Sequence, residues 1–455
     1  MDLAGADFDE VTAALQTRAV SSVELVGAYQ RRIEDLDVGG PALRSVRALC
    51  ESAAEQAAAA DRARGRGGGG PLLGVPVLVK DNIDVAGMAT TAGSLALHGW
   101  NRGVDSEAVR RLRRAGAVIL GKTNMTEWAN FMASGMPAGY SAAGGQVRNP
   151  YDTGRSPGGS SSGSAVAVAA GLCPLAVGTE TMGSILSPAD ACSVVGVRPT
   201  PGTTGRRGVV PVASSYDTVG PLAATVKGAA ALLGALRGGT APPVLHAGAV
   251  RGARLGVLDT AVPEGAERLW ADAVAAFADL GAVVVAVSPE AGPHDPQVML
   301  FEFRRDIDAY LGGLAPEAPV HSLAELVEFN RSHPAEELAY GQSILLRCLE
   351  IDVTDARTQT RYELARRADL LTRNRLGSVL AQHRLEALLF PAAASAPLAA
   401  RAGCPSVSVP AGYSDDRQPF GVSLLGPAGS DGRLLSIASA LEDVLGARRP
   451  PILAG

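Results

Sequence analysis

The chain has 455 residues, of which 47% are hydrophobic and 19% are charged, and its formal net charge is −5. This composition supplies a large apolar core and excludes an extensively disordered protein. The negative charge gives no basic field for a nucleic-acid backbone, and neither a signal-peptide pattern nor an apolar run of membrane-spanning length occurs. We therefore predict one globular domain over 1–455, with no nucleic-acid partner and no membrane association.

The cysteines are odd in number and widely spaced, without CxxC pairs or neighbouring histidines that would suggest a metal site. Reduced thiols in a cytoplasmic protein are the expectation, with no metal ion bound. The five residues are Cys50, Cys173, Cys192, Cys348 and Cys404.

The first predicted element is an amphipathic helix near 21–36. Ser21 and Glu24 form a capping-box pattern, and apolar residues then recur at helical spacing. An alanine-rich helix is predicted near 50–64. The glycine run at 64–70 has no side chains to bury, so it is predicted to be a surface loop.

The next segments alternate between strand and helix patterns. LLGVPVLVKDNID is apolar and β-branched and ends at Lys80, as a buried strand feeding a polar loop would. DSEAVRRLRRAG, AVILGK and TNMTEWANF then predict helix, strand and helix. This alternation indicates an α/β fold with a central mixed β-sheet covered by helices on both faces.

The sequence changes character over 227–385. ARLGVL, a helix near 264–281 and AVVVAV predict a further βαβ unit, and mostly helical patterns follow. We interpret this region as a mainly helical peripheral insertion. Over 386–455, the strands EALLFPA, PSVSVPAG and FGVSLLGP and the helix GRLLSIASALEDVLG are expected to return the chain to the main sheet.

A glycine- and serine-rich segment runs from Arg155 to Pro201. GGSSSG alone is typical of a flexible linker, but here it leads directly into SAVAVAAG, a small apolar helix suited to burial. A phosphate-binding P-loop would need Lys followed by Ser or Thr after the last glycine, and the segment has neither. GTETMGSILSP then places another serine in a turn whose N–H groups could line an oxyanion hole.

A nucleophilic serine needs a base. The histidines lie in no recognisable triad motif, and no GxSxG motif is centred on Ser160 or Ser184. Lys80 is the other choice, because the apolar run before it could desolvate its amine. Keeping a lysine neutral near pH 7 costs roughly 4–5 kcal/mol, so Lys80 must be buried to act as a base. A solvated surface role for this lysine stays open at this point.

The ordered motifs VKDNID, GRSPGGSSSGSAVAVAAG, GTETMGSI and GVVPVASSYDTVGPLAATV closely resemble those of the amidase signature family. The resemblance covers a core at 80–226 and, more weakly, both ends of the chain. It implies a serine amidohydrolase in which Lys80 is the base, Ser160, on a cis peptide bond, relays the proton, and Ser184 is the nucleophile. The implied reaction cleaves a carboxamide C–N bond through an acyl-enzyme.

The resemblance also implies the surroundings of this triad. Ser161 and Thr179 match positions that support it by hydrogen bonds, and no metal or organic cofactor is implied. The substrate is expected to be a small-molecule or peptide amide. The oxyanion hole would be formed by backbone N–H groups of Thr181, Met182, Gly183 and Ser184.

Within the family, the motifs resemble those of bacterial peptide amidases, which remove C-terminal amides from peptides. Glu180 fits that type, whereas Met182 and Leu186 stand where many members have glycine and arginine. Without the arginine, a neutral or apolar acyl group is expected. Met182 and Leu186 either enlarge an apolar pocket or only repack the loop, and a positive φ at Met182 would be costly.

Two other functions stay open. The first is the glutaminase subunit of an amidotransferase, which shares this catalytic core and needs a partner subunit. The second is a catalytically impaired binding protein of the same fold, a hypothesis motivated by the altered loop around Ser184. A homodimer is an open alternative to a monomer.

Overall fold

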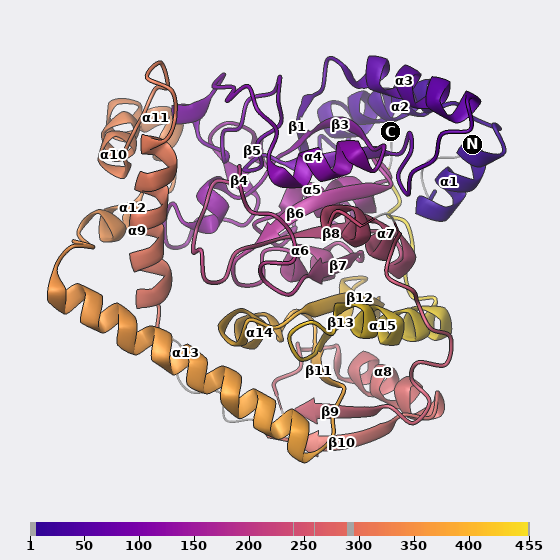
Figure 1. Cartoon of the computed structure of the whole chain (residues 1–455). Helices are drawn as coiled ribbons and strands as arrows, with labels where there is room; N and C mark the ends of the chain where they lie inside the picture. Colours follow the sequence, from indigo (N-terminus) through magenta and orange to yellow (C-terminus); the bar gives the residue numbers. More distant parts are fainter. Residues whose placement is uncertain (1–5, 240, 259, 289–294, 454–455) are drawn as a thin grey trace.

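A computed structural model describes residues 6–239, 241–258, 260–288 and 295–453 (Figure 1). The strands are β1 (Val46–Leu49), β2 (Pro76–Lys80), β3 (Val118–Thr123), β4 (Tyr140–Ser141), β5 (Gly145–Gln146), β6 (Leu175–Glu180), β7 (Val195–Arg198), β8 (Thr218–Ala223), β9 (Arg254–Leu258), β10 (Val283–Val287), β11 (Ala387–Pro391), β12 (Ser406–Tyr413) and β13 (Pro419–Leu425).

The α-helices are α1 (Phe8–Gln16), α2 (Ser22–Ile33), α3 (Ala53–Gly65), α4 (Glu107–Arg114), α5 (Ser162–Ala169), α6 (Leu186–Ala191), α7 (Val226–Leu236), α8 (Glu267–Asp279), α9 (Gln297–Gly312), α10 (Leu323–Ser332), α11 (Pro334–Glu337), α12 (Ser343–Leu349), α13 (Ala356–Gln382), α14 (Ala396–Ala402) and α15 (Asp431–Leu445). Short helices of other types are η1 (Glu34–Val38), η2 (Leu95–Leu97) and η3 (Glu127–Asn130).

One large mixed sheet organises the molecule. Its strand order is β1-β3-β2-β6-β8-β7-β12-β13-β11-β9-β10. Strand β2 runs parallel to both β3 and β6, whereas β8 is antiparallel to β6 and β7. The sheet is mixed, as the sequence predicted.

Helices cover both faces of this sheet. Along β6, Gly178 lies against Ser161 beside α5, while Leu175, which has the opposite strand parity, lies close to Gly228 of α7. Helix α6 packs against α5, and α15 packs against α7. The predicted class, an α/β fold with helices on both faces, is confirmed.

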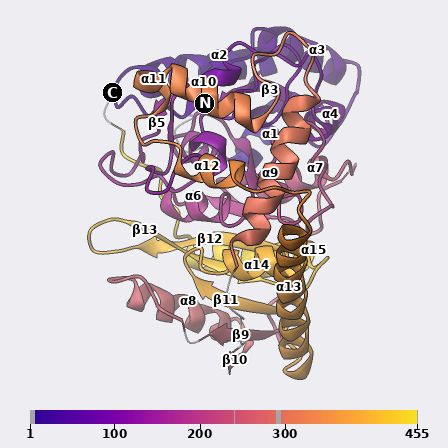
Figure 2. The same cartoon turned by 90° about the vertical axis from the view of Figure 1, so that its left-hand side faces the viewer.

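The chain after α7 first extends the sheet and then becomes helical. Strands β9 and β10 are parallel and are connected by α8, which is the predicted βαβ unit. Helices α9 to α12 then form a helical lobe beside the central sheet, and the long α13 leads back towards β11 (Figures 1 and 2). Phe303 and Ile307 of α9 share an apolar cluster with Trp128 and Val210.

Several local predictions agree with the structure. Helix α2 begins after Ser21, whose side chain accepts a hydrogen bond from the Glu24 N–H at 3.1 Å, while the Glu24 carboxylate accepts one from the Ser21 N–H at 2.8 Å. This reciprocal capping box is the one predicted from the sequence. Strand β2 ends at Lys80, and α15 closes the chain against β12.

The predicted helix over TNMTEWANF is wrong. Residues 127–130 form only the short η3, and within it Trp128 and Ala129 have φ values of 48° and 56°. Tertiary contacts override the helical pattern, because Trp128 is buried and the Glu127 carboxylate accepts a hydrogen bond from the Ala142 N–H at 2.9 Å. The segment becomes a sharp turn packed against the core.

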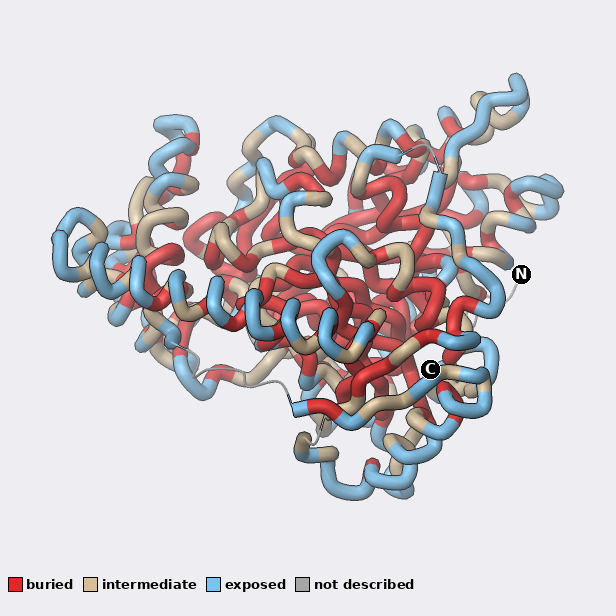
Figure 3. The backbone as a smooth tube through the Cα atoms, turned by 60° about the horizontal axis from the view of Figure 1, so that its bottom comes forward, coloured by how far each residue is buried: buried red, intermediate tan, exposed pale blue. Residues whose placement is uncertain are grey.

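The buried residues are concentrated in the central strands and in the helix faces that pack on them. The strands at the centre are buried and the exposed residues lie at the periphery (Figure 3). All five cysteines are free and buried. Among the described helices, none combines the length and the apolarity needed to cross a bilayer.

Candidate active site

The candidate site lies where two adjacent parallel strands end. Lys80 is the last residue of β2, and Thr179 and Glu180 end the neighbouring β6. Ser160 and Ser161 lie in the turn directly before α5. The peptide bond between Gly159 and Ser160 is cis, which is the geometry that the family resemblance implied.

Lys80 is the centre of a buried hydrogen-bond network. Its Nζ lies 2.9 Å from the hydroxyl oxygens of Ser160, Ser161 and Thr179, and 3.3 Å from the Thr179 carbonyl oxygen. The side chain has no exposed surface. The sequence-predicted residues Lys80, Ser160, Ser161 and Thr179 are therefore brought into direct contact.

Burial controls the charge of Lys80. Removing the ammonium from water lowers the pKa of Lys80 to about 7, although the nearby carboxylates of Glu180 and Asp217 favour the charged form. A substantial neutral fraction is then present near pH 7. The surface role left open by the sequence is excluded.

Ser161 and Thr179 hold each other and the lysine. The Ser161 hydroxyl donates to the Thr179 carbonyl oxygen at 2.9 Å, and the Thr179 N–H donates to Ser161 Oγ at 3.2 Å. Asn82 also donates to Thr179 Oγ1, at 3.0 Å. The sequence reasoning missed Asn82, although it belongs to the VKDNID motif that carries Lys80.

Ser184 lies in the loop between β6 and α6. Its carbonyl oxygen accepts a hydrogen bond from the Ser161 N–H at 3.0 Å, and the residue is 8% exposed. Within the described chain, no hydrogen bond connects the hydroxyl of Ser184 with that of Ser160. The structure thus brings the two serine turns together without a direct bond between their hydroxyls.

The loop before Ser184 has the open donors that an oxyanion site needs. In the part of the chain described, the N–H groups of Met182, Gly183 and Ser184 donate to no other residue. Gly183 takes the left-handed φ of 96°, whereas Met182 is outside that region. The side chain of Met182 therefore does not carry the backbone cost that a positive φ would impose.

Leu186 and Met182 have different surroundings. Leu186 is fully buried at the start of α6 and belongs to the packed interior. Met182 is partly buried and packs against an apolar cluster that includes Tyr216, Val298 and Ala365. Repacking of the loop accounts for Leu186, while Met182 faces the helices α9 and α13.

A buried ion pair between Glu180 and Arg198 stabilises the loop that carries Ser184. The Glu180 carboxylate accepts hydrogen bonds from the Ile185 and Leu186 N–H groups at 2.7 and 2.9 Å. Arg198 lies 3.4 Å from the same carboxylate and donates to the Thr181 carbonyl oxygen at 3.0 Å. Apart from its place in the motif-rich region, no sequence signal marks Arg198 for this role.

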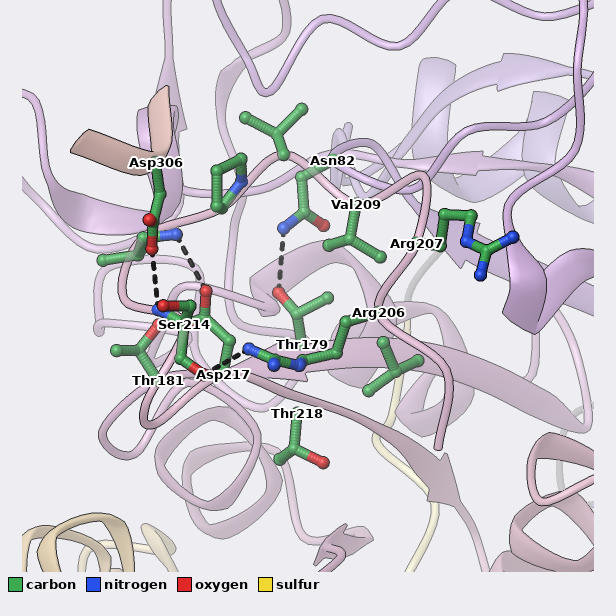
Figure 4. Close-up of a pocket in the computed structure, with 14 residues that line it drawn as sticks. Asn82, Thr179, Thr181, Arg206, Arg207, Val209, Ser214, Asp217, Thr218 and Asp306 are labelled. Atoms are coloured by element: carbon green, nitrogen blue, oxygen red, sulfur yellow. Dashed lines mark hydrogen bonds between the residues drawn. The ribbon is translucent and has the colours of Figure 1, made fainter. Parts of the chain in front are cut away.

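A cavity of about 290 Å³ adjoins the lysine network (Figure 4). Thr179, Asn82 and Thr181 line it, and Figure 4 shows Thr181 beside Asp217 at one end. Burial raises the pKa of Asp217 to about 6, although the Thr181 hydroxyl stabilises its charged form. The cavity walls thus include residues from the lysine network and from the Ser184 loop.

Along almost its whole length, the chain is similar to amidases and to amidotransferase subunits. The profile of the Amidase family matches residues 24–402. The chain is 34% identical to a probable amidase of Arabidopsis thaliana, over 98% of this chain and 91% of the relative. It is 35% identical to a glutamyl-tRNA(Gln) amidotransferase subunit of Salinispora arenicola, over 99% of this chain and all of the relative.

Among solved structures, the native peptide amidase of Stenotrophomonas maltophilia superposes with a TM-score of 0.93. Its sequence is 40% identical to this chain, and the superposition covers 99% of both chains.

Proposed function

Because the chain belongs to the Amidase family and is an amide-hydrolysing enzyme, we propose that it uses a serine acyl-enzyme and the Lys80–Ser160–Ser184 triad. The observation that carries this proposal is the contact between the buried Lys80 amine and Ser160 Oγ at 2.9 Å. A lysine with a pKa of about 7 is a competent base at neutral pH.

In the acylation step, Ser184 Oγ attacks the carbonyl carbon of the amide. Its proton passes to Ser160 Oγ as the Ser160 proton passes to neutral Lys80. The tetrahedral oxyanion receives hydrogen bonds from the open N–H groups of the loop from Thr181 to Ser184, each worth roughly 3–4 kcal/mol in such sites. Thr179 and Ser161 keep the Lys80 amine directed towards Ser160.

Collapse of this intermediate breaks the C–N bond. The proton held by Lys80 returns through Ser160 to the leaving nitrogen, so ammonia or an amine departs neutral. Water then attacks the Ser184 ester with the same relay as its base, which releases the carboxylic acid and restores Ser184. The relay ends each cycle in its starting protonation state.

The proposed substrate is the C-terminal amide of a peptide or another neutral, apolar amide. Support comes from the peptide amidase of Stenotrophomonas maltophilia, which matches 99% of this chain at 40% identity. Leu186 offers no charge to a substrate carboxylate, and Met182, within the Ser184 loop, is a partly buried apolar side chain.

Hydrolysis of glutamine for an amidotransferase is the second candidate. It is supported by the 35% identity to the amidotransferase subunit of Salinispora arenicola over its full length. Such an enzyme would depend on a partner subunit, whereas a peptide amidase would act alone. The third hypothesis, an impaired binding protein, predicts no acyl-enzyme at all.

The deciding experiment is labelling of the purified chain with a small fluorophosphonate, followed by intact-mass measurement and peptide mapping. We expect one adduct, on Ser184, and its loss in Ser184→Ala and Lys80→Ala. Ser187→Ala is the matched control, because Ser187 lies on the same segment at the start of α6 and has no role in the proposed relay. An unlabelled wild-type chain would refute the acyl-enzyme mechanism.

Substrate assays then separate the candidates. Ammonia release from N-acetylphenylalaninamide by the chain alone supports the peptide amidase. Release from glutamine that needs an added amidotransferase partner supports the second candidate instead.

The proposal also covers the cellular location, the division of the chain into parts and the oligomeric state. The free, buried cysteines support a reducing, cytoplasmic location. A core at 80–226, an insertion at 227–385 and a returning segment at 386–455 stay predictions, as does the choice between monomer and homodimer.

A further inference from the structure

Residues 213–217, here called the anchor segment, connect the Ser184 loop to the helical lobe. The segment follows the GVVPV turn and precedes β8. The N–H groups of Tyr216 and Asp217 both donate to the Ala213 carbonyl oxygen at 2.9 Å, which closes the segment into a tight turn. Side chains and N–H groups are thereby directed outward to different neighbours.

Helix α9 holds the first half of the anchor segment. The Ser214 N–H donates to the Asp306 carboxylate at 3.0 Å, and the Ser215 N–H donates to the Glu302 carboxylate at 2.8 Å. Glu302 has no exposed surface and also accepts hydrogen bonds from the hydroxyls of Ser215 and Tyr362, the latter at 2.7 Å. Two carboxylates of one helix therefore fix two successive backbone groups.

Helix α13 holds the next residue. The Tyr216 hydroxyl donates to the Asp369 carboxylate, which also forms an ion pair with Arg401 at 3.0 Å. The Tyr216 carbonyl oxygen accepts a hydrogen bond from the buried Arg198 at 2.7 Å. Tyr216 is thus held through its side chain by α13 and through its backbone by Arg198.

The last residue of the segment reaches the Ser184 loop. Asp217 Oδ1 accepts the Thr181 hydroxyl at 2.6 Å, while Oδ2 accepts the N–H groups of Val212 and Ala213 at 2.9 and 3.0 Å. The two backbone bonds orient the carboxylate, so it can hold Thr181 in one place. Thr181 is three residues before Ser184, in the turn whose N–H groups are open.

We propose that Asp217 is a positioning residue for the amidase reaction. Its carboxylate, oriented by the anchor segment, holds the Thr181 hydroxyl and thereby sets the donors that precede Ser184. The inference rests on the proposed function. Asp217 and Thr181 both line the cavity, and the Asp217 carboxylate acts through its hydrogen bond with the Thr181 hydroxyl.

The Asp217–Thr181 contact is expected to affect the rate of the reaction rather than the binding of the substrate. A donor displaced by about 1 Å from the developing oxyanion reduces the rate by roughly 100-fold, because such donors act only in the transition state. Ground-state binding of the amide does not depend on them. Loss of the Asp217–Thr181 contact should therefore lower kcat and leave KM nearly unchanged.

The test is a double-mutant cycle of Asp217→Asn, Thr181→Val and the double variant in the full chain. We expect each single variant to lower kcat and the fluorophosphonate labelling rate of Ser184 by about 10- to 100-fold, at unchanged KM. The double variant should be no slower than the slower single variant, since both changes remove the same contact. Circular-dichroism melting establishes that each variant is folded.

Glu442→Gln is the matched control, because Glu442 is another partly buried carboxyl that accepts backbone N–H bonds, from Val226, far from this loop. It should keep the wild-type kcat. Wild-type rates in Thr181→Val, or multiplying losses in the double variant, would overturn the positioning role. Thr181→Val decides the question even if Asp217→Asn does not fold. An unlabelled wild-type Ser184 would instead refute the proposed function itself.

Discussion

Lys80 shows how one buried side chain sets the working pH of the proposed mechanism. It must be neutral to accept the Ser160 proton, and its pKa is lowered to about 7 by burial. The log of kcat/KM should therefore rise with pH up to about 7 and level off above it. A pH series with a peptide amide measures this, and a flat profile between pH 5 and 8 would contradict the assignment.

A second buried group could produce the same pH dependence. Burial also raises the pKa of Asp190 to about 7, and this carboxylate accepts the Gly421 N–H at 2.6 Å. Asp190→Asn is therefore the control for the pH series. It should retain the acidic limb, because Asp190 has no contact with Lys80 in the described hydrogen bonds.

Removing one partner of the Glu180–Arg198 ion pair is expected to lower the free energy of unfolding. Both side chains are fully buried, so Glu180→Gln leaves Arg198 without its counter-charge. Breaking such a pair costs about 3–5 kcal/mol, and urea unfolding should report this loss in the free energy of unfolding. The exposed pair between Arg155 and Asp416 is the contrast, and Asp416→Asn should leave the unfolding midpoint unchanged.

At the scale of elements, α5 is pressed against the backbone of two neighbouring segments. A Cβ added to Gly163 would lie 2.3 Å from the Ser45 carbonyl oxygen and 2.4 Å from that of Asn124. Gly163→Ala should therefore move α5 and the serine turn that precedes it. We expect lower thermal stability together with slower Ser184 labelling.

Gly377 in α13 is the matched helical glycine. A Cβ there meets nothing within 4 Å. Gly377→Ala should raise the free energy of unfolding by about 0.5–1 kcal/mol, since alanine loses less backbone entropy in a helix. If both alanine variants had the same effect on melting temperature, close packing of α5 would not be the cause.

At the scale of the whole molecule, a pair of buried carboxyl groups connects the helical lobe to the core. Glu337 of α11 accepts the Leu95 N–H at 2.6 Å, and burial, together with the nearby Glu337, raises the pKa of Glu127 well above its usual range. Between its ordinary pKa and this raised pKa, Glu127 is protonated more fully in the folded chain than in the unfolded chain. The stability it contributes is present at low pH and lost as pH rises through the raised pKa.

Glu127→Gln mimics the protonated carboxyl and should remove this loss. Urea unfolding midpoints measured from pH 5 to 9 should decline more steeply with pH in the wild type than in the variant. Parallel curves would show that the carboxyl pair does not connect lobe stability to pH.

Local sequence patterns were sufficient to predict the elements with strong periodicity and the residues of the ordered motifs. The strand before Lys80 and the capping box of α2 follow from apolar runs and capping side chains that are close in the chain. The motif resemblance identified Ser160, Ser161 and Thr179, and all three lie around Lys80.

Contacts between distant segments, in contrast, became visible only in the folded chain. No local sequence pattern predicts the turn at Trp128. The same is true of two contacts between distant residues, the Glu180–Arg198 ion pair and the Asp217–Thr181 hydrogen bond. Thr181 and Asp217 are 36 residues apart in the chain. Their meeting depends on how the sheet orders its strands and how α9 and α13 pack, and the free energy of that packing belongs to the whole fold.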